Sequence, residues 1–140
     1  MNTHEKGFTL VEIMVVVSII VLLAAIAIPN LLRSRVSANE AAAIAALKTL
    51  SAAAETYFMA QAPMAYPASL AALSSPTPPY IDSNLGSGNK SGYSFNWSGG
   101  GNTYSVVASP QSPNVTGVRS FFIDASGVVR VGTNASGTPL

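Results

Sequence analysis

The first part of the chain is dominated by apolar residues, interrupted by a single carboxylate. Residues 8–28 form a run of 21 residues in which Glu12 is the only charged side chain. At roughly 1.5 Å of rise per residue, this run is long enough to cross a bilayer as a helix. An ionised carboxylate within a membrane span costs on the order of a few kcal/mol unless it finds a partner. Glu12 is therefore the first candidate for a functional residue.

The next segment, from Asn30 to about Ala60, has the pattern of an amphipathic helix. It is rich in alanine and contains neither glycine nor proline. Its larger apolar residues recur every three or four positions, which predicts a stripe that packs against a core from Ile44 onward. Pro29 lies at the junction, where a proline kinks or loosens a helix without necessarily ending it. The stripe consists of Val36, Ile44, Leu47, Leu50, Ala54 and Phe58, whereas Arg33, Arg35, Glu40, Lys48 and Glu55 are expected mostly on other faces.

The rest of the chain is rich in proline and glycine and contains short segments in which apolar and polar residues alternate. Residues 61–92 are expected to be mostly loop, with one or two helical turns at 68–73. Apolar and polar residues then alternate on both sides of a glycine-rich turn at 98–102, which predicts a β-hairpin. We expect strands at residues 93–97, 104–108, 119–124 and 128–131. The predicted fold is α+β: a long N-terminal helix packed on a small antiparallel sheet of about four strands.

Composition narrows the possible functions. The chain has 140 residues, a formal net charge of +1, and no basic cluster beyond Arg33 and Arg35, so we predict no nucleic-acid partner. It contains no cysteine, and its one histidine is His4. Disulfides and thiolate sites are therefore excluded, as are histidine-based triads and most zinc sites beyond residue 7. We expect neither an enzyme nor a cofactor.

Asp82 and Asp124 are the candidates for a calcium site in the second half of the chain. Calcium requires several converging oxygen ligands, but these two acids are isolated in the sequence and no acidic loop accompanies them. Asp124 is explained more simply as the residue that opens the turn before Gly127. We therefore predict no metal site.

Three interpretations compete for the N-terminal segment. A secretory signal peptide is disfavoured because its apolar region is about 7–15 residues long, and residues 8–28 are longer and contain Glu12. An ordinary membrane anchor is physically allowed, with Glu12 reaching the membrane surface. The third interpretation is a resemblance: residues 6–14, KGFTLVEIM, resemble the processing site of type IV pilins and type II secretion pseudopilins.

The resemblance implies how this segment is used. A leader, residues 1–7, is removed by a prepilin peptidase that cuts between Gly7 and Phe8, and the new N-terminal Phe8 is methylated. Pro29 falls where this family often has a helix-kinking proline. The absence of cysteine departs from the many type IV pilins that close a C-terminal loop with a disulfide. The implied segments are the leader 1–7, a hydrophobic transmembrane and polymerisation helix 8–29, an amphipathic helix 30–61, and a head of loop and sheet 62–140.

Cleavage after Gly7 also supplies a partner for Glu12. It creates an α-amino group at Phe8, and in a helical stack the Glu12 of one subunit pairs with the Phe8 ammonium of a neighbour. A buried pair of this kind fixes register more than it adds stability. Phe8, Glu12 and Pro29 are therefore the predicted assembly residues.

The implied function is that of a structural subunit of a type IV pilus, which waits in the inner membrane and then joins an extracellular filament. The implied partners are identical subunits in a helical homopolymer, the prepilin peptidase and the pilus assembly machinery. Two alternatives stay open: a pseudopilin of a type II secretion system, which forms a periplasmic pseudopilus, and a monomeric membrane-tethered binding module. The positive-inside rule places Arg33 and Arg35 in the cytoplasm, whereas the resemblance implies a cytoplasmic leader.

Overall fold

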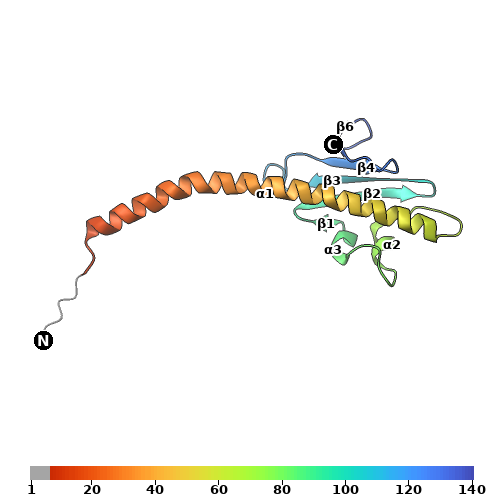
Figure 1. Cartoon of the computed structure of the whole chain (residues 1–140), viewed down its shortest axis with the longest axis horizontal. Coiled ribbons are helices and arrows are strands. Elements are labelled where there is room, and N and C mark those ends of the chain that lie inside the picture. The colour runs from red at the N-terminus through yellow and green to blue at the C-terminus, as the bar shows by residue number, and fades with distance from the viewer. Residues whose placement is uncertain (1–6) are drawn as a thin grey trace. The chain divides into compact units, whose positions relative to one another are not determined.

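The computed structural model describes residues 7–140, so the predictions about residues 1–6 of the leader lie outside the described residues. Within residues 7–140, one long helix, two short helices and one six-stranded antiparallel sheet are present (Figure 1). The helices are α1 (Leu10–Ala60), α2 (Leu70–Ser74) and α3 (Ser83–Gly86). The strands are β1 (Asn89–Lys90), β2 (Tyr93–Gly100), β3 (Thr103–Pro110), β4 (Phe121–Asp124), β5 (Arg130–Val131) and β6 (Thr138–Pro139). The predicted α+β fold is confirmed.

The chain divides into two compact units, Met1–Ser34 and Arg35–Leu140, and α1 contributes to both. We call residues 10–34 of α1 the stem and residues 35–140 the head. Pro29 lies inside α1, which continues past it to Ala60. The prediction that this proline need not end the helix is therefore confirmed.

The sheet of the head follows the order of the chain, β1-β2-β3-β4-β5-β6, with every pair antiparallel. Its longest pairing is the predicted hairpin of β2 and β3, which runs from Tyr93 opposite Pro110 to Gly100 opposite Thr103. Gly101 follows β2 with φ +66°, a left-handed conformation that glycine adopts without strain. The sheet is larger than the four strands predicted, because β1 and β6 are two residues long and too short to give a visible alternation.

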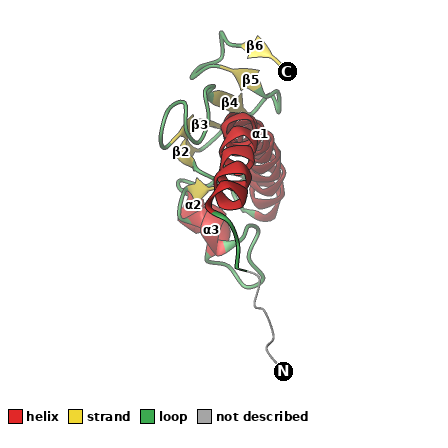
Figure 2. Cartoon of the chain, turned by 90° about the vertical axis from the view of Figure 1, so that its left-hand side faces the viewer, coloured by secondary structure: helices red, strands yellow, loops and turns green. Residues whose placement is uncertain are grey.

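The core of the head lies between α1 and one face of the sheet, as Figure 2 shows. The apolar stripe is confirmed from Ile44 onward: Leu47, Leu50 and Ala54 are buried, and Ile44 is partly buried against the same core. The sheet contributes its inward-facing side chains, including the two fully buried tyrosines Tyr93 and Tyr104. Burial of these residues from both elements is the main source of head stability.

Glu40 departs from the predicted pattern. It was expected away from the packed face, but only 6% of it is exposed. Buried carboxylates are costly unless they are paired and hydrogen-bonded. The contacts that compensate Glu40 are long-range, and they are described with the candidate site.

Residues 61–92 also contain more helix than predicted. The expected turns at 68–73 correspond to α2, but α3 was not predicted. Asp82 accounts for α3, since its Oδ1 accepts a hydrogen bond from the Leu85 backbone N–H (2.7 Å) and so caps the helix. At the end of α1, the Tyr66 ring stacks on Phe58 with a centroid separation of 4.5 Å, and its hydroxyl donates to Glu55 Oε1 (2.8 Å).

Candidate functional site

The start of α1 is closed by hydrogen bonds between Thr9 and Glu12. The Thr9 backbone N–H and hydroxyl both donate to Glu12 Oε2, at 2.8 Å and 2.7 Å. In return, the Glu12 backbone N–H donates to Thr9 Oγ1 (3.2 Å). Because Thr9 directly precedes the first helical residue, Leu10, this arrangement is a capping box. The structure therefore gives Glu12 a partner within its own chain.

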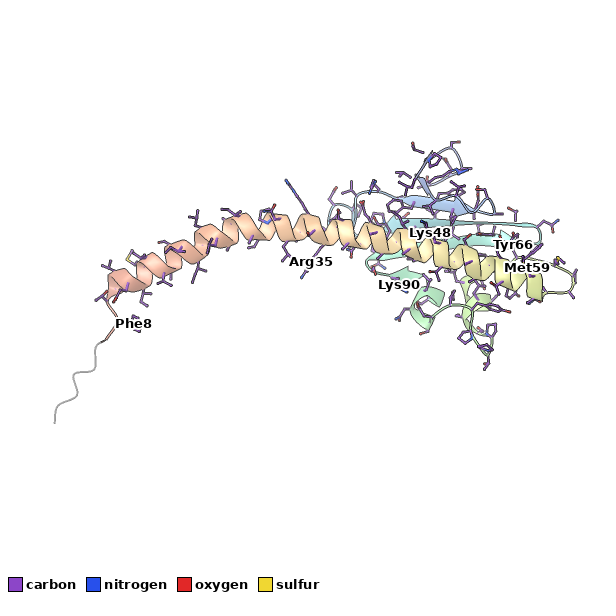
Figure 3. All side chains as sticks on the ribbon, viewed as in Figure 1. Phe8, Arg35, Lys48, Met59, Tyr66 and Lys90 are labelled. Carbon is purple, nitrogen blue, oxygen red and sulfur yellow. The ribbon has the colours of Figure 1, made fainter. Side chains whose placement is uncertain are left out.

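The predicted processing residues lie just ahead of this cap. Phe8 is 83% exposed and stands before the first turn of α1, where Figure 3 labels it. Among the described residues other than Gly7 and its chain neighbours, no heavy atom lies within 4 Å of the place that a Cβ on Gly7 would occupy. The peptide bond between Gly7 and Phe8 is thus open on the side of both residues, and its cleavage stays a prediction.

The stem exposes its apolar side chains around the whole helix (Figure 3). Every large apolar residue from Phe8 to Leu32 is more than half exposed. By length and composition, α1 is able to cross a membrane, and the most apolar part of it has no cover from the rest of the chain. A surface of this kind must be covered by lipid or by other protein molecules.

The polar side chains of the stem turn back onto the helix. The Ser18 hydroxyl donates to the Met14 carbonyl (2.7 Å), and the Asn30 side-chain amide donates to the Ile26 carbonyl (3.1 Å). Together with the Thr9–Glu12 cap, these bonds satisfy polar groups without a second molecule. Pro29 has no N–H to donate, so it weakens the helix locally at the end of the apolar run. Its predicted role in assembly is not tested by these contacts.

A second carboxylate, Glu40, ties α1 to the sheet of the head. Its Oε1 accepts the backbone N–H groups of Val118 (3.0 Å) and Arg119 (3.1 Å). Its Oε2 accepts from Arg119 Nε (2.8 Å) and Nη2 (2.6 Å), a bidentate pair. We call this set of contacts the Glu40 clasp. Sequence reasoning missed it because its partners lie 78 and 79 residues away and no local pattern marks them.

Neighbouring residues extend the clasp. The Asn39 side-chain amide donates to the Thr116 carbonyl (2.9 Å), and the Tyr93 hydroxyl donates to the Arg119 carbonyl (2.8 Å). The Arg119 guanidinium also lies over the Phe121 ring, 5.5 Å from its centre. The segment that leads into β4 is therefore fixed to α1 by the side chains of α1 and to β2 by the Tyr93 hydroxyl.

Electrostatics agree with this geometry. Burial by itself raises the pKa of Glu40, but the Arg119 side chain and the Val118 and Arg119 backbone N–H groups outweigh it and hold this pKa below its ordinary value. Burial, with the negative charge of Glu40 nearby, raises the pKa of Tyr93 to about 12. Glu40 is therefore ionised and Tyr93 neutral at pH 7, as their hydrogen bonds require.

Asp82 and Asp124 each have a structural role. Besides capping α3, Asp82 pairs through Oδ2 with Lys90 Nζ (2.7 Å). Asp124 Oδ1 accepts the Ser126 backbone N–H (2.9 Å) and hydroxyl (2.5 Å), which closes the turn that ends at Gly127. Among residues 7–140, no group of three or more histidine or acidic side chains comes together in a way that could hold a metal ion.

Comparisons with known proteins bear on the N-terminal segment. The family model described as the prokaryotic N-terminal methylation motif matches residues 2–28. The chain is 44% identical over 57 residues to the type IV major pilin protein PilA of Myxococcus xanthus, a stretch that covers 41% of this chain and 26% of that protein. It is 54% identical over 37 residues to the type IV wide pilus major component PilA4 of Thermus thermophilus, covering 26% of this chain and 28% of that relative. These stretches span little more than a quarter of either relative. No solved structure matches the chain significantly.

Proposed function

We propose that this chain is a structural subunit of a type IV pilus, because its N-terminal segment matches the prokaryotic N-terminal methylation motif and is similar to the same part of two pilus proteins. The observation that carries the proposal is the order of features at the N-terminus. An accessible Gly7–Phe8 bond stands directly before a capped helix whose apolar surface is uncovered. Such a chain requires a membrane before assembly and other subunits after it.

The first step of the proposal is proteolytic. A prepilin peptidase hydrolyses the Gly7–Phe8 bond, so that water adds across it and leaves a carboxylate on Gly7 and an ammonium group on Phe8. The absence of a side chain at Gly7, and the open space around it, support access of a protease to this bond. Methylation of the new Phe8 amine follows and leaves its positive charge in place.

The second step is a change of partner for Glu12. Before assembly, the Thr9 hydroxyl and N–H satisfy the carboxylate, which lowers the cost of placing it near a membrane. In the polymer, Glu12 pairs with the Phe8 ammonium of a neighbouring subunit. A charge pair in an apolar bundle of stems contributes mainly by excluding other registers, because an unpaired carboxylate there is strongly disfavoured.

The two relatives support a pilus over a secretion pseudopilus, since one is a type IV major pilin and the other a major component of a type IV wide pilus. The precursor then resides in the inner membrane, and the assembled product is an extracellular filament of identical subunits. The pilus assembly machinery is the third partner that the family implies. We place no catalytic activity in this chain.

The role of Glu12 is tested with Glu12→Gln in the full chain. Glutamine still accepts the two hydrogen bonds of the capping box but carries no charge. We expect the variant to enter the membrane and to be cut after Gly7, while the yield of sheared filaments falls by at least roughly tenfold.

The matched control is Thr9→Val, which breaks the cap and keeps the carboxylate. We expect this variant to retain most of its filaments, because the intersubunit pair does not need the Thr9 hydroxyl. Wild-type filament yield from Glu12→Gln, or an equal loss from Thr9→Val, would show that Glu12 acts as a helix cap and not as an intersubunit partner.

A further inference from the structure

A loop of the head, residues 112–118, exposes two apolar side chains close together in the sequence. Val115 is 65% exposed and Val118 is 63% exposed, although both are β-branched aliphatic residues. Single exposed aliphatic residues are common on protein surfaces, but two of them on one short loop call for a cause. We call residues 112–118 the valine loop.

The valine loop has a defined internal structure. The Val115 and Thr116 backbone N–H groups both donate to the Ser112 carbonyl, at 3.1 Å and 2.9 Å. The Asn114 N–H donates to the Gly117 carbonyl (2.8 Å), and the Ser112 N–H donates to the Thr116 hydroxyl (3.1 Å). These bonds close the loop on itself, so the positions of its two exposed valines are set by the backbone.

The loop is also held firmly against the head. The Glu40 clasp binds the Val118 N–H, and Asn39 binds the Thr116 carbonyl, so the C-terminal part of the loop is fixed to α1 at two points. At Gly117, a Cβ would lie 2.0 Å from the Tyr93 hydroxyl oxygen, so only glycine permits this close approach. A buried carboxylate is a costly way to stabilise a loop, but it fixes one geometry.

From these observations we propose that the valine loop is a docking surface for the apolar stem of a second copy of this chain. The proposal rests on the proposed function, because it assigns a further contact within the same polymer. The argument for this occupant is chemical. The stem is an uncovered apolar helix, residues 105–118 contain no charged side chain, and the charge of the next residue, Arg119, is paired with Glu40.

The position of the loop along α1 also favours a second copy. The loop binds Asn39 and Glu40, which follow the end of the stem at Ser34 by five and six residues on the same continuous helix. The valine loop is therefore bonded to the same helix that carries the stem, close to the stem in sequence.

The contact is tested by cross-linking in assembled filaments, which the absence of cysteine makes unambiguous. Two tagged forms of the full chain are co-expressed, one with Val118→Cys and the other with a single stem cysteine, in turn Ile26→Cys, Ile28→Cys and Leu32→Cys. After treatment with a short bismaleimide, we expect a mixed dimer for at least one stem position. Thr77→Cys, exposed on a different loop, is the control and should give none.

Filaments in which Val118→Cys links to none of the stem positions, or links no better than Thr77→Cys, would overturn the proposal. If the unmodified chain forms no filaments at all, the proposed function fails first, and the two failures are thereby distinguished. Since the cysteine replaces an exposed side chain, it leaves the backbone bond from Val118 to Glu40 intact.

A second variant measures how much the contact matters. Val115→Ser with Val118→Ser removes the exposed apolar surface without adding charge beside the clasp, and we expect filament yield to fall roughly tenfold. Met59→Ser with Met64→Ser is the matched control, because these side chains are equally exposed but Met59 lies about 30 Å further along α1 than Asn39. Equal yields from the two double variants would contradict a specific role for the valine loop.

Discussion

The stem and the head portion of α1 belong to one continuous helix but differ in how their apolar side chains are covered. In the stem, most apolar residues are large, and each of the large ones is more than half exposed. In the head, the buried positions of α1 are mostly alanine, and the bulky partners such as Tyr93, Tyr104 and Phe121 come from the sheet. Small residues on the helix let the sheet approach closely, so the head completes its own core. Within residues 7–140 no other element covers the stem, so its apolar surface must be covered by lipid or by other protein molecules.

The two carboxylates differ in the same way. Glu12 bonds to Thr9, three residues away, at an exposed helix end, whereas Glu40 is buried and bonds to the segment before β4. The first contact is local, and under the proposed function Glu12 exchanges it for a partner from another subunit. The second is long-range and belongs to the folded head. Glu40 therefore stabilises the fold of the head, whereas for Glu12 we propose a role in assembly.

The largest effect is expected from placing a charge in the middle of the stem. Ile20→Asp puts a carboxylate near the centre of the apolar run, at a cost of roughly 3 kcal/mol for insertion. We expect the variant to be lost from the membrane fraction and to form no filaments. Ala52→Asp, on an exposed face of α1 in the head, should still enter the membrane. Normal filaments from Ile20→Asp would show that the stem tolerates a charge as well as the exposed surface of the head does.

Truncation of leucine compares the two regions directly. Leu50 is fully buried under the sheet, so Leu50→Ala should lower the free energy of unfolding of the head by about 3 kcal/mol. Leu32→Ala, in the exposed stem, should leave it within about 0.5 kcal/mol of the wild type. Chemical denaturation of the full chain in detergent, followed by near-UV circular dichroism, measures both. Equal destabilisation by the two variants would mean that the stem is part of the head's folding unit.

Loss of the Glu40 charge should have a somewhat smaller effect. Glu40→Gln leaves the half-exposed Arg119 guanidinium with an amide in place of a carboxylate, and we expect a destabilisation of about 2 kcal/mol. Glu55→Gln is the control, since Glu55 makes one hydrogen bond, from the Tyr66 hydroxyl. The same denaturation measurement should therefore rank Glu40→Gln clearly below Glu55→Gln in stability.

Acid should weaken the head through the same residue. The folded-state pKa of Glu40 lies below the ordinary value of 4.5, so its contribution is complete above that pH and is lost as the pH falls through the lowered pKa. Between pH 7 and pH 3, the wild type should thus lose more stability than Glu40→Gln, which has no group to protonate there. Parallel loss in the two proteins would show that Asp82, Asp124 or other acids account for the acid sensitivity.

Much of this fold was predictable because its signals are local. The alternation around the glycine-rich turn marks β2 and β3, and the spacing of Leu47, Leu50 and Ala54 marks the packed face of α1. The capping box of Thr9 and Glu12 was not predicted, although its signal is local. A threonine three positions before a glutamate is typical of this motif. The two-residue strands β1 and β6 are too short to show periodicity.

The burial of Glu40 and its long-range contacts were not predictable from the sequence alone. By composition it is one of several charged residues on an alanine-rich helix, and such residues are usually solvated. Its burial follows from where the sheet places Val118 and Arg119, far away in the sequence. The candidate site at the N-terminus was predictable for the opposite reason, since Gly7, Phe8 and Glu12 lie within six residues of one another.

The proposed function requires that the chain is cleaved between Gly7 and Phe8 and that its stem then joins a filament. Intact-mass spectrometry of filaments sheared from cells that express the full chain tests this directly. We expect one protein that begins at Phe8 and carries a single added methyl group on its N-terminus. Filaments whose subunits retain residues 1–7, or surface preparations from which this chain is absent while it stays uncut in the membrane, would contradict it.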